Sequence, residues 1–198
     1  MKKIILRYNL EIFSFIVMLV LLIRFLFLPD LSEEHRILSA FMIMAIMHEY
    51  EEKRIPGGFF EMMSNKFGLP EEKRHFEKPG LCVTIYWTVI LIAASFFPNP
   101  VLLILLSCLG LFEAFIHTAG IRIHRLSKPY TPGLVTAWIM AAVSVFTIRY
   151  LTAGDLAGPV TYTVGIILFI LTFITLGMSV MRSFGMSFAD IPKNIKSK

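Results

Sequence analysis

Histidine and glutamate side chains gather near the end of one long apolar segment, in the run His48-Glu49-Tyr50-Glu51-Glu52. Successive residues of an α-helix are rotated by about 100°, so His48, Glu51 and Glu52 would share one face of a helix. Carboxylates held this close repel one another, and a charge inside a membrane costs several kcal/mol unless it is paired. This face therefore needs a cation, which could be a metal ion, protons or the basic side chains that follow.

A second apolar segment carries a similar set of side chains, Glu113, His117 and His124. Offsets of four and eleven residues bring all three to one stripe of a helix. Glu113 and His48 both lie fourteen residues beyond the points where their segments are expected to enter the membrane. We therefore predict that the two sets lie at the same depth and face each other.

Imidazole and carboxylate groups in this combination favour a metal site. They are ligands of Zn²⁺, and of iron or manganese where carboxylates are more numerous. The predicted ligands of a divalent metal (Zn, or Fe/Mn) are His48, Glu52, Glu113 and His117. Glu51, on the other flank of the same face, is predicted to be the catalytic general base. Two other interpretations stay open, because the cluster could work as an acid–base site without metal, or its members could only pair with one another and with Lys53 and Arg54.

The segment 130–136 opens a later apolar run with a Pro-Gly turn. A proline and a glycine at a helix entrance fix a turn and leave backbone N–H groups free at the helix N-terminus. Such groups can bind an anion or a lipid headgroup, and we keep this interpretation beside that of a purely structural turn. His124, Tyr130 and Thr136 are accordingly predicted to contact the substrate.

These stretches resemble a known family. The run His48-Glu49-Tyr50-Glu51-Glu52 fits the pattern of one histidine, two variable residues and two glutamates that names the HXXEE-domain membrane proteins. The stretch from Glu113 and His117 through residues 130–136 is similar to that family's second signature, a helix with a histidine followed by Tyr-x-Pro-Gly and a threonine. The resemblance implies a small multi-pass membrane protein and does not imply a particular reaction.

The composition requires membrane helices to position these residues. Of the 198 residues, 56% are apolar and only 17% are charged, and the mean hydropathy is +0.71. A soluble domain has about 25% charged residues and a disordered chain has low hydrophobicity, so both classes are excluded. We predict an all-α membrane bundle in a single domain (1–198), because each apolar run can cross about 30 Å of hydrocarbon. The six predicted spans are 11–28, 34–52, 80–97, 99–121, 132–151 and 159–181.

The basic residues predict how the chain crosses the membrane. Sixteen of the 19 Lys and Arg residues fall on the side of the N-terminus, in the leading segment, two loops (53–79 and 122–131) and the C-terminal tail. Basic loops stay in the cytoplasm, so we predict an integral membrane protein with both termini cytoplasmic, in the plasma membrane of a prokaryote. The net charge of +5 then reflects topology and contact with membrane lipids, and no nucleic acid partner is expected. Residues 57–68 are predicted to form an amphipathic helix on the membrane surface, as an anchor or as a lid.

The function expected from the sequence is that of a membrane-embedded, metal-dependent enzyme acting on a lipid or other hydrophobic substrate from the cytoplasmic leaflet. A metal-bound water could act in hydrolysis, and iron or manganese held by the same ligands could support oxidation. The alternatives are a small transporter coupled to protons or cations and a metal-free acid–base isomerase. Apolar residues beyond the predicted site, at 41–47 and 101–106, argue against a transport path.

Overall fold

The computed structural model describes the chain except for residues 1, 28–31, 67–68, 70, 72–75 and 187–198. The described residues form eight α-helices and no strand, which confirms the all-α prediction for this part of the chain. The helices are α1 (Lys2–Arg7), α2 (Asn9–Phe27), α3 (Glu33–Lys53), α4 (Phe59–Lys66), α5 (Glu77–Phe96), α6 (Pro100–Ile123), α7 (Leu134–Ala153) and α8 (Pro159–Ser183).

The long helices follow the predicted spans closely. Five of the described helices, α2, α5, α6, α7 and α8, are long and apolar enough to cross a membrane, as in an integral membrane protein. α3 has a comparable length of 21 residues, but charged residues occupy both of its ends and it is not one of these five. Its role as a sixth span, and the side of the membrane on which the termini lie, stay predictions. α4 lies within the predicted amphipathic segment 57–68, of which residues 67–68 are outside the described part.

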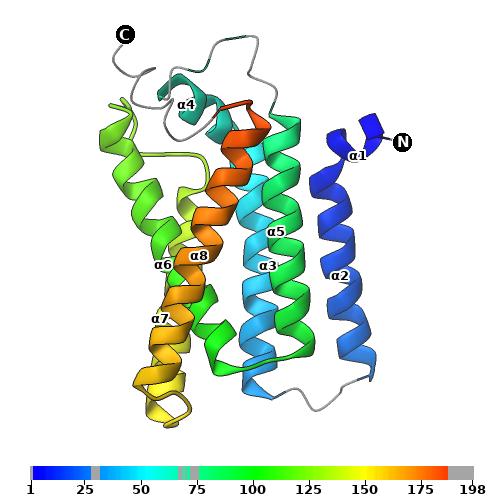
Figure 1. The fold of residues 1–198 in the computed structure, drawn as a ribbon, viewed down its shortest axis with the longest axis vertical. Coiled ribbons are helices and arrows are strands. Elements are labelled where there is room, and N and C mark those ends of the chain that lie inside the picture. Colours follow the sequence, from blue (N-terminus) through cyan, green and yellow to red (C-terminus); the bar gives the residue numbers. More distant parts are fainter. Residues whose placement is uncertain (1, 28–31, 67–68, 70, 72–75, 187–198) are drawn as a thin grey trace.

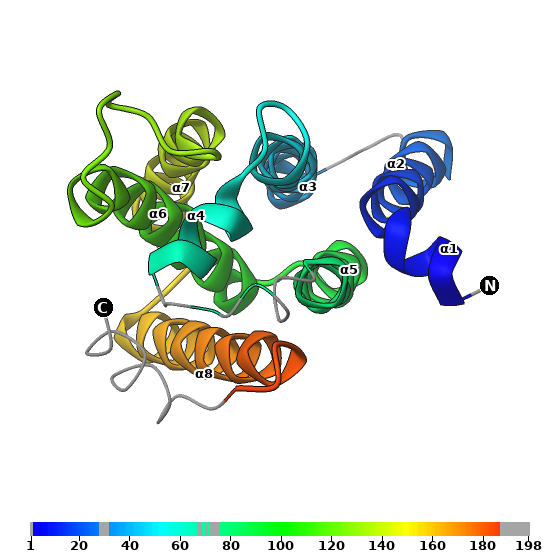
Figure 2. The ribbon, with the colours of Figure 1, turned by 90° about the horizontal axis from the view of Figure 1, so that it is seen from above.

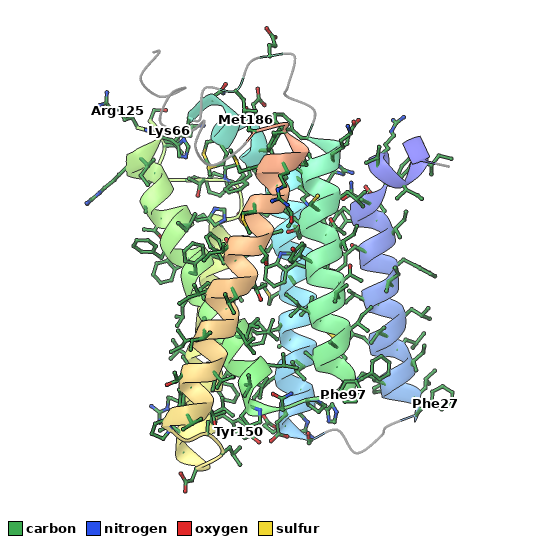
Figure 3. The ribbon with its side chains drawn as sticks, in the orientation of Figure 1. Phe27, Lys66, Phe97, Arg125, Tyr150 and Met186 are labelled. Atoms are coloured by element: carbon green, nitrogen blue, oxygen red, sulfur yellow. The ribbon has the colours of Figure 1, made fainter. Side chains whose placement is uncertain are left out.

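The helices α3, α7, α6, α8 and α5 form a ring when the bundle is viewed from above (Figure 2). α3 contacts α7, α7 contacts α6, α6 contacts α8, α8 contacts α5, and α5 contacts α3. α2 lies outside this ring against α5 and α3, and α4 lies across one end of the bundle (Figure 1). We name this the α4 end. Lys66 and Arg125 lie there, whereas Phe97 and Tyr150 lie at the opposite end (Figure 3).

Helices α6 and α7 approach each other closely because small residues line their contact. A Cβ atom on Gly110 would lie 2.8 Å from the carbonyl oxygen of Met140, so a larger residue does not fit at this crossing. One turn further along, Ala114 forms a small buried cluster with Ala137 and Ala141. This packing brings the turn that begins α7 against the part of α6 that carries the predicted site.

The half of the ring away from α4 is lined by apolar side chains. Phe41 and Met42 of α3 belong to the same buried cluster as Leu103 and Leu106 of α6, and all four are at most 1% exposed. The acidic and histidine side chains predicted to form the site therefore lie between α4 and an apolar layer.

Candidate metal centre

Two histidines and two glutamates meet inside the ring at the α4 end. They are His48 and Glu52 of α3, and Glu113 and His117 of α6. One possible ligand atom from each residue lies within 4.8 Å of those of the other three. His48, Glu52 and His117 are buried, whereas the side chain of Glu113 is 19% exposed. The structure thus brings together the four residues that the sequence predicts as ligands.

The distances between these atoms match the size of a metal coordination shell. The Nε2 atom of His117 lies 3.2 Å from Oε1 of Glu52 and 3.6 Å from Oε2 of Glu113. The Nε2 atom of His48 lies 3.6 and 3.7 Å from the same two oxygens. Ligands bound to zinc at about 2.0 Å in a tetrahedron are separated by about 3.3 Å. The four residues therefore fit one ion placed between them.

Two threonines orient the histidine rings so that both Nε2 atoms face the centre. The hydroxyl of Thr131 donates to the carbonyl oxygen of His117 (3.0 Å) and can accept a hydrogen bond from Nδ1–H of the same residue (3.2 Å). The hydroxyl of Thr136 donates to Glu51 (2.5 Å) and can accept from Nδ1–H of His48 (3.0 Å). With a proton held on each Nδ1, each Nε2 is available as a ligand, as in metal sites where outer partners orient the histidines.

The Nε2 atom of His117 is buried and has no hydrogen-bond partner among the described residues. Buried nitrogens of this kind usually have one. Oε1 of Glu52 lies 3.2 Å away but forms no hydrogen bond with this nitrogen. A metal ion between the four groups would satisfy this nitrogen and both carboxylates. Protons on the two Nε2 atoms would also balance the charge of the two carboxylates.

Glu51 lies outside this group of four and holds the start of α7. Its carboxylate accepts hydrogen bonds from the phenol of Tyr130 (2.8 Å), from the N–H groups of Val135 (3.2 Å) and Thr136 (2.9 Å), and from the Thr136 hydroxyl (2.5 Å). A carboxylate in this position satisfies N–H groups that have no partner within the helix. The carboxylate predicted to be the general base is thus engaged by four hydrogen bonds.

Gly133 lets the turn before α7 lie directly against the centre. Its φ angle of 96° is in the left-handed region, which glycine adopts without strain. A Cβ atom at this position would lie 2.5 Å from Cε1 of His117 and 2.9 Å from Cγ of Glu52. The Pro-Gly turn found in the sequence therefore serves to bring α7 close to two of the candidate ligands.

One protein-family model covers all of these residues. A model described as a protein of unknown function with HXXEE motif matches residues 39–148, which is more than half of the chain. The chain belongs to the HXXEE family. No curated protein and no solved structure matches it. The matched range contains the four candidate ligands, Glu51 and the turn before α7, so the resemblance seen in the sequence is confirmed.

The geometry gives the three named positions of the HXXEE motif different roles in this member of the family. His48 and Glu52 are one helical turn apart and face the candidate metal centre. Glu51 faces α7 and is linked back to His48 through the hydroxyl of Thr136. The second glutamate of the motif is thus a candidate ligand, and the first supports the ring of the histidine.

The basic residues that follow the motif pair with other carboxylates. Lys53 forms a buried ion pair with Glu49 and donates a hydrogen bond to the carbonyl oxygen of Gly80 on α5 (3.2 Å). Arg54 pairs with Glu11 of α2 (3.1 Å). Glu49 was not among the residues predicted to form the site, although its spacing of four residues from Lys53 is typical of helical ion pairs. Neither basic residue neutralises the group of four.

A cavity of about 260 Å³ adjoins the candidate metal centre inside the ring. His48, Glu52 and Glu113 contribute to its wall, and its remaining lining is apolar apart from Glu49 and Thr172. α4 covers the cavity with aromatic and methionine side chains, and the ring of Phe59 lies 5.1 Å from that of His117. The centre therefore borders a space suited to a hydrophobic molecule.

The three residues predicted to contact substrate lie elsewhere. His124 is the C-cap of α6, where burial and the nearby charge of Lys66 lower the pKa of its ring. Tyr130 and Thr136 both bond to Glu51, and burial together with this carboxylate raises the pKa of Tyr130 to about 12. None of the three is among the described residues that line the cavity. Their contact with a substrate stays a prediction.

Proposed function

We propose that this protein is a membrane-embedded, metal-dependent enzyme that acts on a lipid or other hydrophobic substrate from the cytoplasmic leaflet. One observation carries the proposal: two imidazoles and two carboxylates present their ligand atoms to a common point inside the bundle. The buried Nε2 atom of His117, which has no hydrogen-bond partner among the described residues, supports a metal ion at that point.

The metal would be held by His48, Glu52, Glu113 and His117, and a ligand set of this kind suits zinc, iron or manganese. When bound, such an ion lowers the pKa of a coordinated water and polarises an ester or phosphoryl oxygen, whereas iron or manganese also supports oxidation. A catalytic metal needs a position open to substrate, so with four protein ligands the ion would have to take at least one further ligand, as iron and manganese commonly do. Glu113, the most exposed of the four, lies on the wall of the cavity and marks the side from which substrate would approach.

We assign Glu51 a positioning role in place of the general-base role expected from the sequence. Its carboxylate accepts four hydrogen bonds, which stabilise its charged form and leave it poorly placed to take a proton from water. Through Thr136 it keeps the proton of His48 on Nδ1. The residue acts on the metal through its ligand and not on the substrate.

We propose a bundle of six spans in which α3 crosses the membrane together with the five apolar helices. The charged ends of α3 would then lie at the two membrane surfaces, and most Lys and Arg residues would lie at the α4 end. The positive-inside tendency puts that end, and both termini, in the cytoplasm. The plasma membrane of a prokaryote is the proposed location, with membrane lipids as the surroundings of the site.

The two alternative functions receive less support. A transporter needs a polar path to the opposite surface, but a buried apolar layer that includes Phe41 and Leu103 lies below the site. A metal-free isomerase would use protonated histidines, whose Nε2–H groups would then be expected to donate to the carboxylates. Nε2 of His117 forms no hydrogen bond with a carboxylate of the described residues, which favours the metal over this arrangement.

Elemental analysis of the protein purified under mild conditions tests the proposed function. We expect about one equivalent of Zn, Fe or Mn in the natural protein and its loss in His117→Ala. The matched control is His35→Ala, which removes a histidine at the far end of α3 and should retain the metal. A natural protein that holds no metal, even after incubation with each ion, would overturn the proposal in favour of an acid–base site.

A further inference from the structure

We infer that the cavity beside the metal centre binds a single linear hydrocarbon chain, with its polar end at Glu113 and its methyl end directed away from α4. The inference rests on the proposed function and specifies its substrate as a single-chain amphiphile. It is based on the distribution of polar groups around the cavity, its length and its position behind α8.

Polar groups line the cavity mainly at the end that borders the metal centre. His48, Glu52 and Glu113 lie there, and from Glu113 toward the opposite end α6 contributes Phe112, Leu109 and Leu105. A polar group placed among these apolar side chains would have no hydrogen-bond partner and would cost several kcal/mol. The part of the substrate that extends beyond the reacting group must therefore be hydrocarbon.

The length of the cavity matches a chain of medium length. Glu113 and Leu105 both line it and are eight residues apart on α6, a distance of about 12 Å along the helix. An extended chain advances by about 1.2 Å per bond. The space beyond Glu113 thus accommodates roughly ten carbon atoms of an extended chain.

The position of α8 connects the cavity with the surrounding hydrocarbon. α8 is the least buried of the five apolar helices, since only 11% of its most apolar stretch of 18 residues is buried inside the bundle. Several residues of α8, Phe173 among them, line the cavity, so this helix lies between the cavity and the surface of the bundle. A lipid chain in the bilayer would therefore reach the cavity by displacing side chains of a single helix.

Binding of n-alkyl hydroxamates, with two to sixteen carbons in the chain, tests this inference. A hydroxamate binds metal ions, and its chain would occupy the cavity. The metal-loaded protein in nanodiscs of one phosphatidylcholine would be titrated with each compound. We expect affinity to rise about fourfold per methylene until the chain reaches about ten carbons, and then to become constant.

Two tryptophan variants of α6 separate the cavity from general partition into the bilayer. Leu105 lies at the end of the cavity away from Glu113. Leu105→Trp should therefore bind short hydroxamates normally, but its affinity should stop rising at a chain several carbons shorter than in the natural protein. Leu111 faces outward with 39% exposure, and Leu111→Trp should behave as the natural protein. Ala45→Phe, which fills the cavity from α3, provides a second test should Leu105→Trp fail to fold.

The metal content of each sample distinguishes a failure of this inference from a failure of the proposed function. Two results with metal bound would show that the single-chain substrate is wrong while the metal enzyme still stands. In the first, hydroxamate affinity does not depend on chain length. In the second, the affinities of Leu105→Trp and Leu111→Trp stop rising at the same chain length. If the natural protein holds no metal, the proposed function fails and the inference fails with it.

Discussion

The hydroxyl of Thr136 stands between the candidate metal centre and Glu51, and replacing it by valine tests whether this link orients the centre. The hydroxyl donates to Glu51 at 2.5 Å and accepts from Nδ1 of His48 at 3.0 Å. Valine has a similar shape but no polar atom, so Thr136→Val removes both bonds while preserving the packing of α7 against α3.

The expected effect follows from what each partner retains. Glu51 keeps the hydrogen bonds from Tyr130 and from two backbone N–H groups, so most of its stabilisation remains. His48 is 6% exposed and loses the partner of Nδ1–H, which costs about 1–3 kcal/mol. An energy of that size corresponds to roughly a 10- to 100-fold loss of metal affinity, as is typical of removing an outer hydrogen bond from a metal-bound histidine.

Metal affinity measured by competition with a chelator, together with thermal unfolding with and without metal, provides the assay. Thr147→Val is the matched control, because this threonine of α7 is also buried and, among the described residues, donates to the carbonyl oxygen of Val143 in its own helix (2.8 Å). The reasoning would be refuted by a Thr136→Val protein with unchanged metal affinity, or by an equal loss in Thr147→Val.

Three further predictions follow from the same region. Gly133→Ala should abolish metal binding and lower the melting temperature, because its Cβ would lie 2.5 Å from His117; unchanged metal content in this variant would contradict the close contact. The pKa of Tyr130 rises from its ordinary value of 10 to about 12, so its bond to Glu51 contributes stability below pH 10 that is lost as pH rises through 12. The difference in unfolding free energy between the natural protein and Tyr130→Phe should therefore shrink over this range, and a constant difference would exclude the bond. Lys66→Cys should resist a membrane-impermeant thiol reagent added to intact cells and react after lysis, whereas labelling in intact cells would reverse the proposed orientation.

The elements of this fold can be predicted from the sequence because they depend on local patterns. Long apolar runs ending in charged or turn residues predict the helices to within a few residues, as for the span 159–181 and the helix Pro159–Ser183. The direction in which a side chain leaves a helix is also local. His48 and Glu52 share a face because they are four residues apart, and Glu113 and His117 share one for the same reason. The group of four was therefore foreseeable from spacing and equal depth.

The roles of the remaining polar residues depended on contacts between distant segments. Glu51 has the type and position of a general base in the sequence, but in the structure it binds Tyr130 and the first N–H groups of α7, which are about 80 residues away along the chain. Glu49, for which no role was predicted, is the buried partner of Lys53. Nothing in the spacing of these acidic residues indicates which of them meets a donor.

The sequence by itself determined where the helices lie and which side chains share a helix face, because helix geometry is set within a few residues by the backbone. Only the tertiary structure decided which carboxylates are free to bind a metal and which are held by hydrogen bonds. That choice depends on the close approach of α6 and α7 at Gly110 and on the turn at Gly133. The close approach at Gly110 places the start of α7 beside α3, and the turn at Gly133 lets this start contact His117 and Glu52 without a clash. Hydrogen-bond donors of α7 therefore reach Glu51. Glu52 and Glu113 stay grouped with the two histidines.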